Sequence, residues 1–154
     1  MITFGGQKSG KHAPFLISLS EEPDNALKLV ISLSYAGEKG SDVSELPALS
    51  EILKECRPIY PDKNQTYEIL FEQYILYLNR NESYTSWDNS EIYKGKYFIL
   101  FEKSQLLTIL PVLTDCQILS DGTYYPGKYQ HYGIYCQNHI IDVISCHEPL
   151  IKKL

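Results

Sequence analysis

Residues His131 to Pro149 read HYGIYCQNHIIDVISCHEP and give the clearest indication of the fold. Both HYGIYC and IIDVIS are rich in strand-forming residues, and Gln137-Asn138 can form a two-residue turn because asparagine tolerates a positive φ. These features predict a β-hairpin. Its register pairs Cys136 with His139, Ile134 with Ile141, Gly133 with Asp142, and Tyr132 with Val143.

Directly opposed residues of a hairpin share a face. One face is predicted to be the apolar, core-forming one, and it carries Tyr132, Ile134, Cys136, His139, Ile141 and Val143. The other face carries His131, Gly133, Tyr135, Ile140, Asp142 and Ile144. The histidines are expected to be the polar ends of this edge of the core.

The hairpin also holds three of the four histidines and two of the four cysteines, which raises the question of a metal site. Cys146 and His147 lie about seven residues along an extended strand from Cys136 and His139, hence roughly 20 Å away. A tetrahedral zinc site needs four ligands around one point, so no metal is predicted. A thiol on an apolar face is usually a small core residue, which argues against a Cys–His nucleophile pair.

The remaining patterns along the chain predict further strands and two short helices. Strands are expected over residues 15–20, 27–35 and 66–79 and within GKYFILFEKS. An amphipathic helix is expected in ELPALSEILKEC, and a second in SQLLTIL, with Ser104 as N-cap and Pro111 as its limit. The predicted fold is an α+β domain with a mainly antiparallel sheet of about six to eight strands and two short helices.

The length of 154 residues fits a single domain over residues 1–154, in which residues 1–13 are expected to be a flexible arm. The net charge of -5 is unevenly distributed. Residues 1–91 hold 14 acidic and 8 basic side chains, whereas residues 92–154 hold 5 and 6. This distribution argues against binding to nucleic acid and favours a basic partner.

No cofactor is predicted. Residues 5–11, GGQKSGK, fit the start of a phosphate-binding loop, but His12 replaces the required Ser or Thr and Pro14 disfavours the following helix. The start of the chain does not resemble a signal peptide, and its longest near-apolar run is too short to span a bilayer. A cytoplasmic protein with reduced cysteines is therefore expected.

The polar loop Asn79–Glu91, NRNESYTSWDNSE, places carboxylates between aromatic side chains. It is either a solvated loop whose tryptophan folds back on the core, or an acidic-aromatic binding surface. The residues predicted for partner binding are Glu82, Tyr84, Trp87, Asp88 and Glu91. The 13 tyrosines of the chain allow the same two interpretations, half-buried strands or an aromatic contact surface.

The stretch FEQYILYLNRNESYTSWDNSEIYKGKYFILFEKSQLL, with the terminal HYGIYCQNHIIDVIS, resembles small bacterial proteins that include immunity proteins of polymorphic and contact-dependent toxin systems. The resemblance covers roughly Thr66 to Pro149. It implies a non-enzymatic protein that binds and neutralises one cognate toxin domain, such as a basic nuclease, and it assigns no site residues. Two alternatives remain open, a small hydrolase using His139 or His131 with Asp142, and a small-ligand or peptide-binding module.

Overall fold

The computed structural model describes residues 2–6 and 10–154. These residues form an α+β fold of antiparallel sheets, which confirms the predicted class. The helices are α1 (Pro47–Leu53) and α2 (Gln105–Leu113). The strands are β1 (Phe15–Glu22), β2 (Ala26–Ala36), β3 (Ile59–Phe71), β4 (Tyr74–Asn81), β5 (Ile92–Lys94), β6 (Phe98–Lys103), β7 (Gln117–Ile118), β8 (Tyr124–Tyr125), β9 (Gln130–Tyr135), β10 (His139–Ser145) and β11 (Leu150–Lys153). More strands occur than expected, because β5, β7 and β8 have only two or three residues each.

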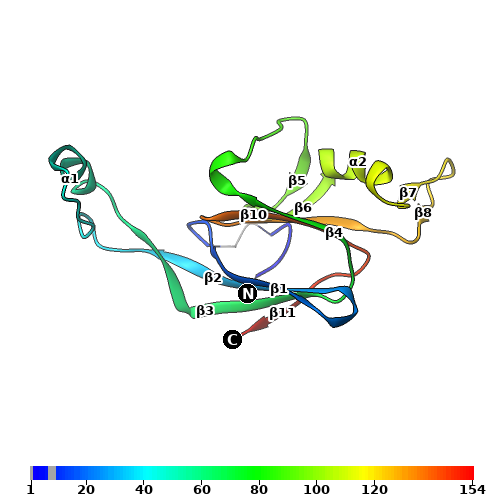
Figure 1. Ribbon diagram of the computed structural model, residues 1–154, viewed down its shortest axis with the longest axis horizontal. Helices are drawn as coiled ribbons and strands as arrows, with labels where there is room; N and C mark the ends of the chain where they lie inside the picture. The colour runs from blue at the N-terminus through cyan, green and yellow to red at the C-terminus, as the bar shows by residue number, and fades with distance from the viewer. Residues whose placement is uncertain (1, 7–9) are drawn as a thin grey trace.

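Two sheets lie one above the other, with α2 and the β4–β5 connection above the second (Figure 1). The first has the strand order β1-β2-β3-β11 and the second β4-β10-β9-β6-β5, while β7 and β8 pair separately. Alternate residues of each strand point to the same face, so one face of each sheet supplies the core between them. That core includes Leu27, Leu29, Ile31, Tyr67, Ile69, Phe71, Phe98, Tyr132, Ile134, Ile141 and Val143. A smaller cluster lies between the second sheet and α2, formed by Leu106, Leu110, Cys116, Tyr129 and Ile144.

The terminal hairpin has the predicted register. Ile134 pairs with Ile141 and Gly133 with Asp142, and the Cys136 N–H donates to the His139 carbonyl at 2.8 Å. Because β10 lies between β9 and β4 and is covered on both faces, every residue from Ile140 to Ser145 is buried. The histidines are not all polar ends, because His131 is only 2% exposed.

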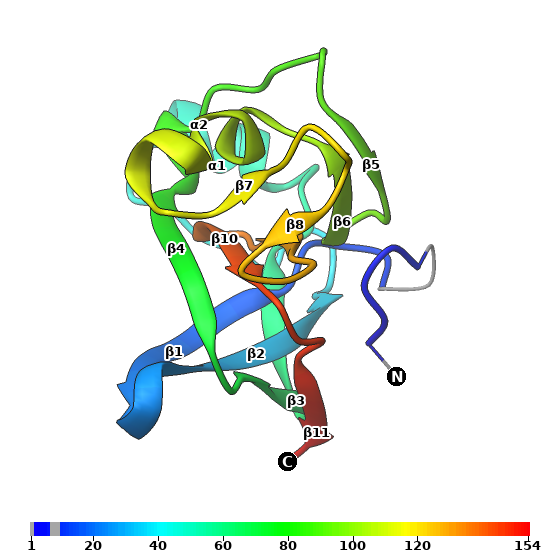
Figure 2. The same ribbon diagram turned by 90° about the vertical axis from the view of Figure 1, so that its right-hand side faces the viewer.

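The strand expected over residues 66–79 is wrong as one element. The chain turns at Glu72 and Gln73, so that β3 belongs to the first sheet and β4 to the second. Two successive polar residues interrupt the alternation there, and the chain passes from one layer to the other, as the end-on view shows (Figure 2).

The described part of residues 1–13 does not extend away from the domain as an arm. Ile2 is 4% exposed within the core. The Phe4 ring packs edge-on against Tyr132, with 5.1 Å between ring centroids, and also against Phe71 and Phe98. These apolar side chains anchor the segment. Residues 1 and 7–9, which include part of GGQKSGK, lie outside the described residues.

The first predicted helix forms as α1, at the end of a long ribbon made by β2 and β3 (Figure 1). Its N-cap is Leu46, and the ribbon carries the helix away from the body of the domain. None of its residues is buried, and the apolar side chains of Leu46, Leu49 and Ile52 are exposed. The amphipathic pattern therefore predicted the helix correctly, although its apolar face does not join the core.

The second helix begins at the predicted cap, because the Ser104 Oγ accepts a hydrogen bond from the Leu107 N–H at 3.1 Å. It continues two residues beyond Pro111, which was expected to limit it. Pro111 has no N–H, so the helix loses only one hydrogen bond, near its end. The Thr114 N–H still donates to the Leu110 carbonyl. Neither described helix has the length and apolar character needed to cross a membrane.

Candidate functional site

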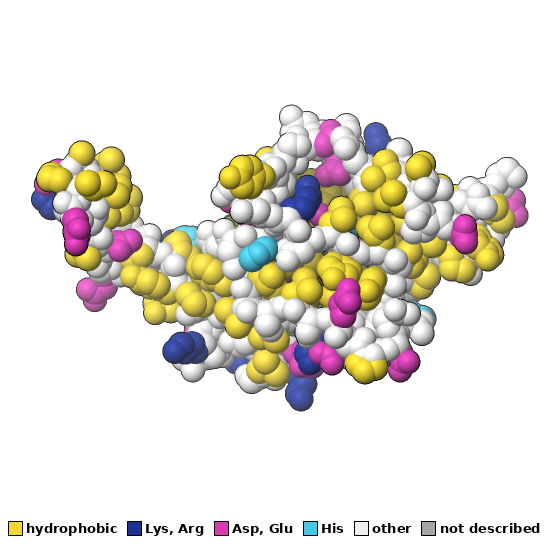
Figure 3. Space-filling model, in the orientation of Figure 1, with side chains coloured by type: hydrophobic (Ala, Val, Ile, Leu, Met, Phe, Trp, Pro, Cys, Tyr) yellow, Lys and Arg dark blue, Asp and Glu magenta, His cyan; other side chains and the backbone are white. Residues whose placement is uncertain are grey.

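A pocket of about 200 Å³ lies between the outer face of the second sheet, α2 and the β4–β5 connection. In the space-filling view, acidic and basic side chains gather between hydrophobic groups in this upper part of the molecule (Figure 3). The residues that line it are Leu78, Arg80, Ser86, Trp87, Asp88, Glu91, Phe101, Gln105, Leu106, Ile109, His131, Tyr135 and Asp142. We call it the rim pocket.

A chain of hydrogen bonds runs beneath the rim pocket. The Ser104 Oγ lies 2.8 Å from His131 Nδ1, and His131 Nε2 lies 2.9 Å from Asp142 Oδ1. The other carboxylate oxygen of Asp142 accepts from Arg80 Nη2 at 2.6 Å. The chain thus links β4, β9 and β10 to the first turn of α2.

The alternation of side chains along strands β9 and β10 places His131 and Asp142 together. His131 and Asp142 both point to the outer face of the hairpin, where Asp142 pairs across the ladder with Gly133. The Phe101 ring stacks on the His131 imidazole, 4.0 Å between centroids and 10° between planes. A Cβ on Gly133 would come within 3.0 Å of the Phe101 ring, so the glycine leaves room for this stack.

The acceptors in the chain assign its hydrogens. The Asp142 carboxylate, which already accepts from Arg80, is an acceptor, so His131 Nε2 donates to Asp142 Oδ1, and in the tautomer with its hydrogen on Nε2 the ring accepts at Nδ1. The Ser104 hydroxyl then donates to Nδ1, while its lone pair accepts the Leu107 N–H. In this hydrogen-bond network, the Ser104 hydroxyl, the His131 ring and the Asp142 carboxylate all have hydrogen-bond partners. Arg80 Nε is buried without a partner among the described residues.

This arrangement contains serine, histidine and aspartate but differs from a hydrolytic triad. In a triad the nucleophile bonds Nε2 and the carboxylate bonds Nδ1, whereas here the two are exchanged. Ser104 is 2% exposed and already caps α2. The geometry is that of a satisfied buried polar network, which fixes the positions of the elements it joins.

The rim is formed by residues of the predicted binding loop. Trp87 is 58% exposed and packs edge-on against the Tyr135 ring at 5.1 Å. Asp88 Oδ2 accepts from Gln105 Nε2 at 2.6 Å, and Glu91 Oε1 accepts from the Gln105 backbone N–H at 3.0 Å. Both carboxylates therefore fasten the loop to the N-terminal end of α2, where negative charge is favourable.

Two ionisable side chains of the rim pocket have shifted pKa values. Hydrogen bonds from the Ser90 backbone and the Gln105 side chain lower the pKa of Asp88 below its ordinary value of 3.8. Burial, followed by the nearby Asp142 and Glu91 carboxylates, raises the pKa of the Tyr135 hydroxyl. The Asp88 carboxyl group therefore stays ionised to a lower pH than usual, and the Tyr135 phenol stays protonated to a higher pH than usual.

The structure brings together three of the five predicted partner-binding residues, Trp87, Asp88 and Glu91. Glu82 and Tyr84 lie in the short 3-10 turn Glu82–Tyr84 that precedes them and do not line the pocket, although Tyr84 is the more exposed aromatic at 88%. Trp87 is 58% exposed and so does not fold back into the core, contrary to the alternative interpretation.

Within residues 2–6 and 10–154, no group of three or more His, Cys, Asp or Glu side chains is placed to hold a metal.

Sequence reasoning named His131 and Asp142 together as one enzymatic alternative, but missed Ser104, Arg80 and Gln105 as their neighbours. The hairpin alternation was a sufficient signal for the first two. The others come from β4 and from the start of α2, whose positions beside the hairpin depend on non-consecutive strand pairing.

A comparison with known proteins found no matching family model, no similar curated protein and no similar solved structure.

Proposed function

We propose that this chain is a non-enzymatic binding protein that holds a basic partner protein at the rim pocket. The observation that carries the proposal is the combination of an exposed indole, Trp87, with the carboxylates of Asp88 and Glu91 at the mouth of one pocket. Aromatic anchors beside charged groups are typical of the few residues that dominate the affinity of an interface.

The charges of the pocket support a basic partner. Its lining holds three carboxylates and one guanidinium, and Asp142 is already paired with Arg80. Asp88 and Glu91 each use oxygens to hold α2, but a carboxylate has about four acceptor positions, so both can accept further donors. The adjoining exposed side chains Ile109, Val112 and Leu113 of α2 supply apolar contact area.

The resemblance to immunity proteins gives the partner its proposed identity, a toxin domain such as a basic nuclease. The acidic first 91 residues would be attracted to such a surface, which should speed association. All four cysteines are free, which is compatible with the cytoplasmic location that we propose.

The test is co-expression with the protein encoded by the neighbouring gene, since immunity genes lie beside their toxins. We expect the two proteins to copurify, and the toxicity of the neighbour to disappear when this chain is present. A neighbour that is harmless to the cell, or that stays toxic and unbound, would contradict the immunity proposal.

A small hydrolase is the second candidate, because Ser104, His131 and Asp142 do lie in hydrogen-bond contact. A substrate would have to reach the serine from the groove of about 540 Å³ that Ser104 borders between α2 and β6. Two observations argue against a hydrolase. Ser104 contacts Nδ1 and Asp142 contacts Nε2, the reverse of a hydrolytic triad, and the Ser104 hydroxyl caps α2. Incubation with a fluorophosphonate probe decides the matter: we expect no labelling of Ser104 in the wild type, and labelling lost in Ser104→Ala would favour the hydrolase.

A further inference from the structure

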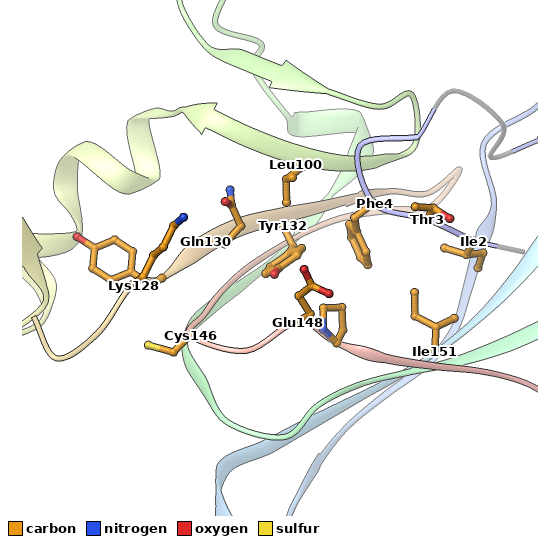
Figure 4. Close-up of a pocket in the computed structure, with 12 residues that line it drawn as sticks. Ile2, Thr3, Phe4, Leu100, Lys128, Gln130, Tyr132, Cys146, Glu148 and Ile151 are labelled. Carbon is orange, nitrogen blue, oxygen red and sulfur yellow. The ribbon is translucent and has the colours of Figure 1, made fainter. Parts of the chain in front are cut away.

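A second pocket, of about 470 Å³, opens on the opposite side of the second sheet, at one end of the core. Its walls come from the N-terminal residues, β6, the start of β9 and the β10–β11 turn (Figure 4). The apolar part of the lining is formed by Ile2, Phe4, Leu100, Pro149 and Ile151. We call it the core-end pocket. It shares no lining residue with the rim pocket.

The hydroxyl group of Tyr132 is available to a ligand in this pocket. Tyr132 is only 4% exposed, yet no described residue forms a hydrogen bond with its hydroxyl group, which borders the pocket. Burial and the Glu148 carboxylate raise the pKa of Tyr132 to about 12, so the hydroxyl stays protonated at neutral pH. Because the hydroxyl faces the pocket, it can accept a hydrogen bond from a molecule bound there or donate one to it.

The charged groups of the pocket are separated. The Glu148 carboxylate points toward the rings of Tyr132 and Phe4, whereas Lys128 lies beyond Gln130 at the other end (Figure 4). Glu148 forms no ion pair with any described residue, so its charge is available to a ligand. The Phe4 and Tyr132 rings meet edge to face, 5.1 Å apart, beside this carboxylate.

These features select the charge of the ligand. A cation beside Glu148 is attracted by the carboxylate and by the faces of aromatic rings. An anion at the same place would be repelled by Glu148, which already disfavours the ionised form of Tyr132. The apolar side chains of Ile2, Leu100 and Ile151 would surround the rest of the molecule.

We propose that the core-end pocket binds a protonated primary amine carried on an apolar aromatic or aliphatic body. The amine donates to Glu148 and to the oxygen of Tyr132, and the apolar body lies against Ile2, Phe4 and Ile151. Because the pocket faces the core side of the sheet, this binding is independent of the proposed partner site.

The experiment is a titration of the full chain with three probes that share one ring and chain length, followed by amide chemical shifts in NMR. The probes are 2-phenylethylamine, the uncharged 2-phenylethanol and the anionic 3-phenylpropionate. We expect the amine to shift the amides of Leu100, Gln130 and Ile151 at millimolar concentration, and to bind about tenfold or more tightly than the other two. No shifts with the amine, or equal or tighter binding of 3-phenylpropionate, would overturn the proposal.

Variants distinguish binding at this pocket from non-specific binding of the amine. Glu148→Gln should weaken amine binding about tenfold, and Tyr132→Phe should weaken it severalfold while keeping the ring in the core. Asp121→Asn removes an equal charge outside the pocket and should change nothing. An amine affinity that is unchanged in Glu148→Gln would contradict the assignment.

A further arm distinguishes two sources of the amine. The peptide acetyl-Leu-Lys-Leu-amide carries the same group on a polypeptide, and it is titrated beside the free amine. Tighter binding of the peptide, lost in Glu148→Gln, would assign the site to a lysine side chain, whereas tighter binding of the free amine would assign it to a small molecule.

Discussion

His131 Nε2 lies 2.9 Å from Asp142 Oδ1, in a place where both side chains are almost completely excluded from solvent. Two strands, β9 and β10, bring them together on the outer face of the terminal hairpin. Ser104 and Arg80 complete the network from α2 and β4. A buried network of this kind stabilises a fold only while all of its members are present.

Ser104→Ala should therefore lower the free energy of unfolding by about 1–3 kcal/mol. It removes the N-cap of α2 and leaves His131 Nδ1 without its partner. Denaturant unfolding followed by circular dichroism measures the change. Ser120→Ala, at an exposed serine, is the matched control and should stay within about 0.5 kcal/mol. Equal stability of the two variants would show that the network contributes nothing.

Ile141→Ala should destabilise the domain by about 2–5 kcal/mol, because Ile141 is completely buried between the two sheets. The comparison is Val112→Ala on the exposed side of α2, where Val112 is 84% exposed and little change is expected. Thermal unfolding of both variants is sufficient. A melting temperature unchanged by Ile141→Ala would mean that β10 is not a core strand.

The carboxyl group of Asp88 should titrate below pH 3.8 in an NMR pH series. Its lowered pKa means that the folded state favours the carboxylate, so the contact with α2 is fully present above the ordinary pKa. That contact is then lost as the pH falls through the lowered value. Gln105→Ala removes one of the two main causes and should move the midpoint upward, though not completely, because the Ser90 N–H remains. A midpoint at or above 3.8 in the wild type would contradict the anchoring role of this carboxylate.

Thiol reactivity should distinguish the cysteines. Burial raises the pKa of Cys136 to about 12, whereas Cys56 is exposed in the connection between α1 and β3. Because the thiolate is the reactive form, Ellman's reagent should modify Cys56 in the native protein and Cys136 only after unfolding. Mass spectrometry of the labelled peptides gives the order. Early modification of Cys136 would indicate a reactive rather than a structural cysteine.

The parts of the fold that could be predicted from the sequence are those determined by local patterns. The two-residue turn Gln137-Asn138 gave the correct hairpin register, although Asn138 does not adopt the positive φ on which the turn was predicted. Ser104 marked the start of α2. The division between β3 and β4 was missed because an apolar alternation says which face is buried but not in which sheet a strand lies. The exposure of α1 could not be predicted either, because an amphipathic pattern predicts an apolar face but does not show which element covers it.

The candidate site was only half predictable for a similar reason. The loop composition named Trp87, Asp88 and Glu91, which the structure brings to one pocket. Gln105, which holds both carboxylates, has no distinguishing sequence feature. Its role depends on the packing of α2 against the loop, and that contact joins segments that only the folded sheet brings together.

Trp87→Ala should leave the fold intact, because more than half of the indole is exposed and its aromatic contact is with Tyr135 at the rim. Its effect should be on the partner complex, whose dissociation should become about thirtyfold faster if the indole is a hot spot worth about 2 kcal/mol. Surface plasmon resonance with the neighbouring gene's product measures this rate. An unfolded variant would show that the indole is a core residue, and an unchanged rate would remove it from the interface.

The most direct test of the rim pocket is a calorimetric titration of that same partner with the double variant Asp88→Asn, Glu91→Gln. The amide oxygens can still accept the Gln105 hydrogen bonds, so the substitutions remove charge while keeping the anchoring of the loop. The matched control Asp115→Asn, Asp121→Asn removes two charges that do not line the pocket. We predict that the rim double variant stays folded and binds at least tenfold more weakly than the wild type and the control, and that its affinity depends less on salt concentration. Equal affinity of all three proteins would contradict the claim that this pocket receives a basic partner.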